Sequence, residues 1–185
     1  ATHVSMCDVC RAELDSYDAV GGVVMEDAVT ADVSSDALAA TMKLIAASDT
    51  ASKAPRRSTG TLPSPLQDYV GGDLSAIKWK PLGMGVKQVI LSTSKAATAR
   101  LLYIPAGAAE PDHGHRGTEL TLVLQGAFRD ETARFAAGDV EVADEDLHHK
   151  PVAEIGHDCI CLAATDAPLR FSAWVPRVAQ SLFRL

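Results

Sequence analysis

The chain begins with a short segment, "THVSMCDVC", whose residue types suit metal binding. His3, Cys7 and Cys10 are spaced four and three residues apart, so a helical turn would align them on one side. Thiolate and imidazole are the usual ligands of structural zinc, and the segment therefore predicts a zinc site. A redox-active dithiol and a chance pairing of two cysteines are the alternatives. Because the segment supplies three ligands, water or a borrowed ligand is expected in the fourth place.

A second group of metal-binding residue types lies in "GAAEPDHGHRGTELTLVLQG", residues 107 to 126. His113, His115 and Glu119 have even offsets, so on a regular strand they would point to one face. Two imidazoles and a carboxylate suit a divalent transition metal. The alternative is a metal-free β domain with surface or core histidines.

Two further cysteines, Cys159 and Cys161, occur in "CICLAA" and would share a strand face. They are either small buried apolar residues or redox-reactive thiols beside the metal. His148 is expected to face solvent.

The N-terminal part carries a helical pattern. Residues 8–27 place Leu14, Tyr17, Val20 and Val24 at spacings of three and four, although Gly21 and Gly22 weaken this helix. Residues 35–47 predict a second helix, which Ser34 or Ser35 would cap. We therefore expect a small helical domain over residues 1–47. Residues 48–65, rich in proline and small polar residues, are expected to form a linker.

The remainder, residues 66–185, is expected to be all-β. Short β-prone runs, separated by turn residues, predict a sandwich or barrel; the runs are IKWKPL, VKQVILS, ARLLYIP, LTLVLQG, DVEVA, CICLAA and LRFSAWV. The predicted fold class is therefore multidomain, α followed by all-β.

The composition of the chain limits the classes of partner that it is expected to bind. The 185 residues carry a net charge of −7, which disfavours direct binding to nucleic acid. No run reaches the ~20 apolar residues that a membrane span needs. The close pairing of four cysteines favours metal or redox chemistry in a reducing cytoplasm over a disulfide framework.

The segment from Gly107 to Gly126 resembles the first cupin motif at every defined position. Of the second cupin motif, Gly138 and His149 are present. Other positions of that motif depart from the pattern, namely Asp144, Asp146 and Ala153. The resemblance implies a cupin barrel (a double-stranded β-helix or jelly roll) over residues 66–185. It also implies a divalent metal (Zn, Mn, Fe or Ni) held by His113, His115, Glu119 and His149.

The N-terminal motif and the cupin motif together resemble the ChrR family of zinc-binding anti-sigma factors. "YDAVGGVVME" and "DCICLAATDAPLRF" add to the likeness, which covers nearly the whole chain. The family supplies its fourth zinc ligand from a histidine on a preceding helix, so we expect that helix to be missing here. The resemblance implies a domain that sequesters an ECF (group IV) sigma factor, and a cupin that releases it in response to singlet oxygen.

Two hypotheses follow for the cupin. As a sensor, it would respond through oxidation of His149 or of the pair Cys159 and Cys161. As an enzyme, it would resemble a dioxygenase or isomerase that uses an open metal position. The strands beside the motif are mostly Leu, Val and Ala, which favours the sensor.

Overall fold

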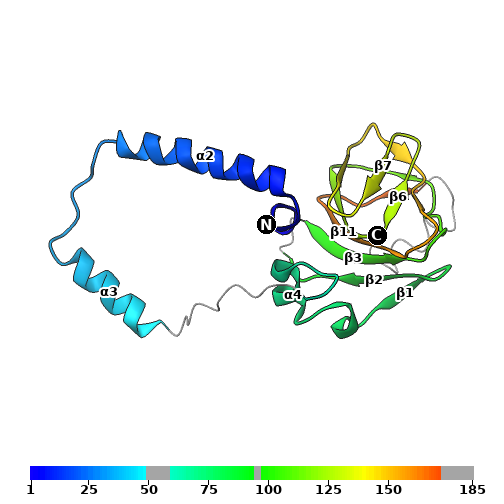
Figure 1. Ribbon diagram of the computed structural model, residues 1–185, viewed down its shortest axis with the longest axis horizontal. Coiled ribbons are helices and arrows are strands. Elements are labelled where there is room, and N and C mark those ends of the chain that lie inside the picture. Colours follow the sequence, from blue (N-terminus) through cyan, green and yellow to red (C-terminus); the bar gives the residue numbers. More distant parts are fainter. Residues whose placement is uncertain (49–58, 94–96, 172–185) are drawn as a thin grey trace. The chain divides into compact units, whose positions relative to one another are not determined.

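The computed structural model describes residues 1–48, 59–93 and 97–171. The chain divides into two compact units, one formed by residues 1–6 with 58–185 and the other by residues 7–57. Helices precede strands along the chain (Figure 1), which confirms the predicted order of an α part followed by a β part. Within the described ranges, no helix is long and apolar enough to span a membrane.

The unit formed by residues 7–57 contains the two predicted helices, α2 (Asp8–Glu26) and α3 (Ala37–Ala47). Helix α2 runs through Gly21 and Gly22 without a break. The predicted serine cap of α3 is wrong: Asp36 precedes the helix, and no side chain caps it. The Ser34 carbonyl instead accepts a hydrogen bond from the Ala37 amide, so the chain is already turning before the helix begins.

The other unit begins with α1 (Thr2–Met6) and resumes with α4 (Ser64–Val70) and the 3-10 helix η1 (Leu74–Ala76). The segment before α4 is tied to the residue before η1, because the Asp73 carboxylate accepts hydrogen bonds from the amides of Thr61 and Leu62 at 3.0 and 2.8 Å. Leu62 is fully buried. Of the expected linker, residues 49–58 lie outside the described residues.

Twelve strands make up the described part of the β domain. Their bounds are β1 Lys80–Gly83, β2 Val86–Ile90, β3 Thr98–Ile104, β4 His113–Gly114, β5 Glu119–Gln125, β6 Ala127–Arg129, β7 Arg134–Ala136, β8 Val140–Ala143, β9 His148–His149, β10 Val152–Ala153, β11 Cys159–Thr165 and β12 Arg170–Phe171. The predicted runs fall on strands, although the first starts at Lys80 rather than at residue 77, and residues 172–175 of the last lie outside the described residues.

The strands form a six-stranded sheet in the order β1-β2-β3-β11-β5-β8 and two three-stranded sheets, β10-β6-β7 and β12-β4-β9. All their pairings are antiparallel. In Figure 1, β6 and β7 lie on the far side of the β domain from β1 and β2. The β12-β4-β9 sheet is short, and it carries His113 in β4 and His148 and His149 in β9.

The central strands of the six-stranded sheet, β3, β11 and β5, bury side chains on both faces. In register across three strands, Leu102, Cys161 and Val123 belong to one cluster. The neighbouring row, which includes Leu101 and Leu122, belongs to the other. We call these the inner and outer clusters. The outer cluster is completed by Met6 and by apolar residues of α4, η1 and the adjoining segments, namely Leu62, Leu66, Val70, Leu74, Ile77 and Trp79.

The inner face also carries polar side chains that are buried. They come from five neighbouring strands: Gln88, Arg100, Thr121, Thr165 and Glu141. In β8 the charged residue faces inward and the apolar residue faces solvent: Glu141 is 5% exposed, whereas Val142 is 65% exposed. A buried carboxylate requires compensating partners, and these partners lie in the histidine site.

Candidate metal centre

Two short paired strands position the first histidines. In the β4–β9 ladder, His113 lies directly opposite His149. His115 follows one residue after β4 ends, and Glu119 begins β5. The expectation that His113, His115 and Glu119 share one regular strand is therefore wrong, because the chain leaves β4 after Gly114 and enters a different sheet at β5.

Three imidazoles converge despite this break. Ring centroids are 4.7 Å apart for His113 and His149, and 5.2 Å apart for each of the two pairs that include His115. The Nε2 atoms of His115 and His149 are 3.2 Å apart. One ring nitrogen from each histidine lies within 4.8 Å of the others, and all three residues are buried.

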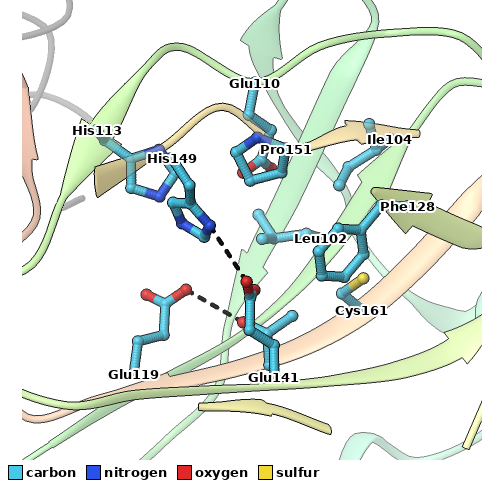
Figure 2. Close-up of a pocket in the computed structure, with 11 residues that line it drawn as sticks. Leu102, Ile104, Glu110, His113, Glu119, Phe128, Glu141, His149, Pro151 and Cys161 are labelled. Carbon is cyan, nitrogen blue, oxygen red and sulfur yellow. Dashed lines mark hydrogen bonds and ion pairs between the residues drawn. The ribbon is translucent and has the colours of Figure 1, made fainter. Parts of the chain in front are cut away.

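Glu119 lines the same cavity but lies outside this three-histidine group. Figure 2 shows His113 and His149 side by side above Glu119 and Glu141, with a dashed line from His149 to Glu141. The Glu119 carboxylate accepts a hydrogen bond from the Thr121 hydroxyl at 3.1 Å. Burial raises the pKa of Glu119, and the opposing influence of His113 only partly offsets this.

The three histidines differ in their electrostatic surroundings. Burial, with His113 and His149 nearby, lowers the pKa of His115 to about 4, so this imidazole is neutral at pH 7. Burial would also lower the pKa of His149. Hydrogen bonds to Glu141 and Asp130 outweigh that effect and raise it to about 9. The His149 Nδ1 atom lies 2.9 Å from Asp130 Oδ2 and 3.2 Å from Glu141 Oε1.

These residues fit a transition-metal ion. A metal ligand must offer a lone pair, and His115 is a buried imidazole that stays neutral. Its Nδ1 atom has no hydrogen-bond partner in the described part of the chain. Buried carboxylates beside the imidazoles would offset the positive charge of an ion. The donor set is mixed imidazole and carboxylate, which does not select among Zn, Mn, Fe and Ni.

Several polar residues of this site were not predicted from the sequence. Glu110 and Glu141 line the cavity, Asp130 contacts His149 from behind, and Arg100 is buried beside the acidic groups. The sequence did carry one signal, because Arg100 and Glu141 each lie two residues from an apolar residue of the same predicted run, Leu102 and Ala143. Leu, Val and Ala dominate the composition of these strands, but the cavity wall also carries the carboxylates of Glu110, Glu119 and Glu141.

Burial governs Glu110 in particular. It raises the pKa of Glu110 to about 7, against the attraction of His149 and Arg100. Arg100 donates a hydrogen bond to Gln88 at 3.3 Å. The cavity thus holds a carboxyl group poised between its protonated and ionised forms.

The two cysteines of the N-terminal group lie close together at the start of α2. The sulfur atoms of Cys7 and Cys10 are within 4.8 Å of each other. A hydrogen bond from the Cys10 backbone amide lowers the pKa of Cys7, and a hydrogen bond from the Cys10 thiol adds to this effect. The hydrogen bond to Cys7 in turn raises the pKa of Cys10. A thiol with a lowered pKa deprotonates readily to bind zinc, so this segment too has donors that fit a metal.

Cys159 and Cys161 lie in the inner cluster, 0% and 1% exposed. Their sulfur atoms are 3.5 Å apart. Contact with Cys159 and burial raise the pKa of Cys161, so it is a thiol rather than a thiolate. Cys161 also lines the histidine cavity. His148, by contrast, is half exposed and pairs with Asp112 at 3.0 Å.

Comparison with known proteins identifies this architecture. The family model described as "ChrR Cupin-like domain" matches residues 67–168. The anti-sigma-E factor ChrR of Cereibacter sphaeroides is 55% identical over all 185 residues and 87% of its own length. The chain belongs to the ChrR family. Its β domain is accordingly a cupin-like domain, preceded by a few helices.

A solved structure from the ChrR family agrees. The crystal structure of Rhodobacter sphaeroides SigE in complex with the anti-sigma ChrR contains a chain with 55% identity and a TM-score of 0.77. The match covers 90% of this chain and 85% of that one. The similarity therefore extends beyond the cupin-like domain into the helical region.

Proposed function

We propose that this protein is an anti-sigma factor that sequesters an ECF (group IV) sigma factor and releases it in response to singlet oxygen. The observation that carries this proposal is 55% identity along the whole chain to a protein named as an anti-sigma factor. Both relatives carry that name, which favours regulation over the enzyme alternative. Because such a sigma factor acts with RNA polymerase, the proposed location is the cytoplasm.

The helices supply the surface that such a partner would cover. Neither α2 nor α3 contains a buried residue. Their apolar side chains are exposed, among them Tyr17, Val20 and Leu38 at 66%, 63% and 75%. Exposed apolar area of this kind is typical of a protein-binding surface. A sigma factor is the partner that the family relationship indicates.

The proposal includes zinc at the N-terminal segment, held by His3, Cys7 and Cys10. The ion would organise a short unit that buries little apolar surface of its own. It also includes a divalent metal in the cupin-like domain, held by His113, His115, Glu119 and His149. There the ion would supply positive charge to a cavity rich in carboxylates. We further infer that the sheets close around this cavity as a jelly-roll barrel.

Release would begin with oxidation in the cupin-like domain. Singlet oxygen is small and uncharged, so it can enter an apolar interior. Oxidation of Cys159 and Cys161 to a disulfide would transfer two electrons and two protons to O₂, forming hydrogen peroxide. His149 is the other candidate, because its ring is oxidisable and it contacts the carboxylates of Asp130 and Glu141.

Co-expression tests sigma binding directly. The full-length protein, co-expressed with candidate ECF sigma factors, is expected to purify as a soluble 1:1 complex that contains zinc. Leu38→Asp, on the exposed surface of α3, should weaken capture, whereas Asp146→Asn in the β domain should not. If no ECF sigma factor is captured, and sigma-dependent transcription is unaffected, the proposal fails.

A second experiment tests the sensor. Glu119→Ala and His149→Ala are expected to bind the sigma factor normally but to blunt the transcriptional response to singlet oxygen. Cys159→Ser with Cys161→Ser tests the thiol route in the same assay. A normal response in all these variants would exclude the cupin-like domain as the sensor.

A further inference from the structure

The carboxylate of Asp130 lies directly behind one histidine of the cupin-like site. Asp130 follows β6, at the turn before β7. Its side chain is 0% exposed, and its Oδ2 atom lies 2.9 Å from the Nδ1 atom of His149. The other ring nitrogen of His149 faces His115 at 3.2 Å. Asp130 therefore contacts the metal-binding histidine group from outside the group.

The second oxygen of Asp130 is held by the turn itself. Its Oδ1 atom accepts hydrogen bonds from the Thr132 amide at 2.8 Å, the Thr132 hydroxyl at 2.7 Å and the Ala133 amide at 2.9 Å. Three donors on one oxygen fix the orientation of the carboxylate and favour its ionised form. An ionised carboxylate only accepts hydrogen bonds, so the hydrogen of the His149–Asp130 contact sits on Nδ1.

The same turn also holds the residue after the histidine. The Lys150 amide donates a hydrogen bond to the Glu131 carboxylate at 3.2 Å. Asp130 and Glu131, which are adjacent in the turn, thus form hydrogen bonds with His149 and Lys150, which are adjacent at the end of β9. Glu141 approaches the same His149 nitrogen at 3.2 Å, but the three donors that lock Asp130 make it the better-fixed partner.

We propose that Asp130 is a positioning residue for the metal site. By accepting the Nδ1–H of His149, it fixes the tautomer and ring orientation that present Nε2 to a divalent cation alongside His113 and His115. This inference rests on the proposed metal binding at that site. A carboxylate behind a ligating histidine typically changes metal affinity by about 10- to 100-fold.

Substitution at residue 130 tests this role by zinc binding. In full-length protein, Asp130→Ala is expected to weaken zinc binding at the histidine site by about 10- to 100-fold, measured by competition with a chelator. Asp130→Asn should also weaken it. Its amide cannot accept from both His149 and the turn amides, so one side is left with mismatched donors. Asp68→Asn, on the exposed surface of α4, is the matched control and should bind zinc as wild type does.

A spectroscopic readout separates positioning from simple loss of structure. In protein labelled with ¹⁵N-histidine and loaded with zinc, the His149 resonances are assigned by comparison with His149→Gln. Wild type should show His149 protonated on Nδ1 and bound through Nε2, and Asp130→Ala should show a mixed or altered pattern. Thr132→Val removes one donor to Asp130 and should give a smaller, few-fold loss of affinity, so a poorly folded Asp130→Ala protein would not end the test.

Two failures are distinguishable. If wild-type protein and His113→Ala take up equal zinc, with unchanged histidine resonances, then the proposed metal site itself is wrong. If wild type binds zinc through these histidines, but Asp130→Ala and Thr132→Val bind within twofold of it with His149 still protonated on Nδ1, then Asp130 has no positioning role and the metal site stands.

Discussion

The helices of residues 7–48 and the strands of the β domain carry similar apolar side chains but use them in opposite ways. Helices α2 and α3 have no buried residue, whereas β11 buries five of its seven. Apolar periodicity therefore tells which side chains gain from burial and not what buries them. In the β domain, the sheets of the chain itself bury these side chains. In the helices, a bound partner would bury them.

Hydrogen exchange gives the largest expected difference between the two regions. Amides of β3 and β11 should exchange only on global unfolding, and amides of α2 should exchange at least ~100-fold faster. Adding an ECF sigma factor should slow exchange in α2 selectively. Equal protection of α2 and β11 in the free protein would show that the helices need no partner, which would contradict the contrast.

Truncation of one core residue measures the same contrast in free energy. Ile160 is fully buried in the outer cluster, and Ile160→Ala should lower the free energy of unfolding by about 2–5 kcal/mol. Val20→Ala in α2, at an exposed position, should change it by less than ~0.5 kcal/mol. Urea unfolding followed by tryptophan fluorescence measures both. A comparable loss for Val20→Ala would mean that α2 is packed within the free protein.

The interior carboxyl group Glu110 makes stability depend on pH. Its folded-state pKa is raised to about 7, so the folded state keeps a proton that the unfolded chain releases near pH 4.5. The free energy of unfolding of metal-free protein should therefore fall as pH rises from about 4.5 through 7. Glu110→Gln should remove this loss, gaining about 3 kcal/mol over wild type at pH 8.5 and little at pH 4.

The control for this pH effect is Glu26→Gln, which makes the same chemical change in exposed helix α2. It should alter stability by less than ~0.5 kcal/mol at either pH. Unfolding in the presence of a chelator, repeated at several pH values, gives both curves. A Glu110→Gln curve parallel to that of wild type would show that Glu110 is not the group responsible.

Two glycines provide the smallest expected effects, with opposite signs. Gly126, the last glycine of the cupin motif, has φ of +73°, and an added Cβ would lie 2.7 Å from the Asp158 carbonyl oxygen. Gly126→Ala should therefore destabilise the β domain by about 1–3 kcal/mol. Gly21 in α2 has open space around it, and Gly21→Ala should stabilise the helical state of α2 by up to ~1 kcal/mol and raise its helix content. Thermal unfolding and far-UV circular dichroism measure the two changes.

Local patterns predicted most of the elements correctly. Both helices and the strand runs follow from periodicity and turn residues, because these depend on neighbours within a few positions. The predicted cap of α3 was wrong because Ser34, Ser35 and Asp36 are all residue types that suit the N-cap position. In β8, Glu141 rather than Val142 faces inward, toward His149 and Asp130. Those partners lie outside the sequence window around Glu141.

The sequence by itself determined the donor types, the helix and strand order, and the family motifs, since each is written in residue identity and short spacing. Only the tertiary structure decided which donors meet. It brings His113 and His149 together across the β4–β9 ladder. It separates Glu119 onto another sheet, and it places Asp130 behind His149. The physical reason is that antiparallel register and sheet curvature, which arise from long-range pairing, set distances that spacing along the chain cannot encode.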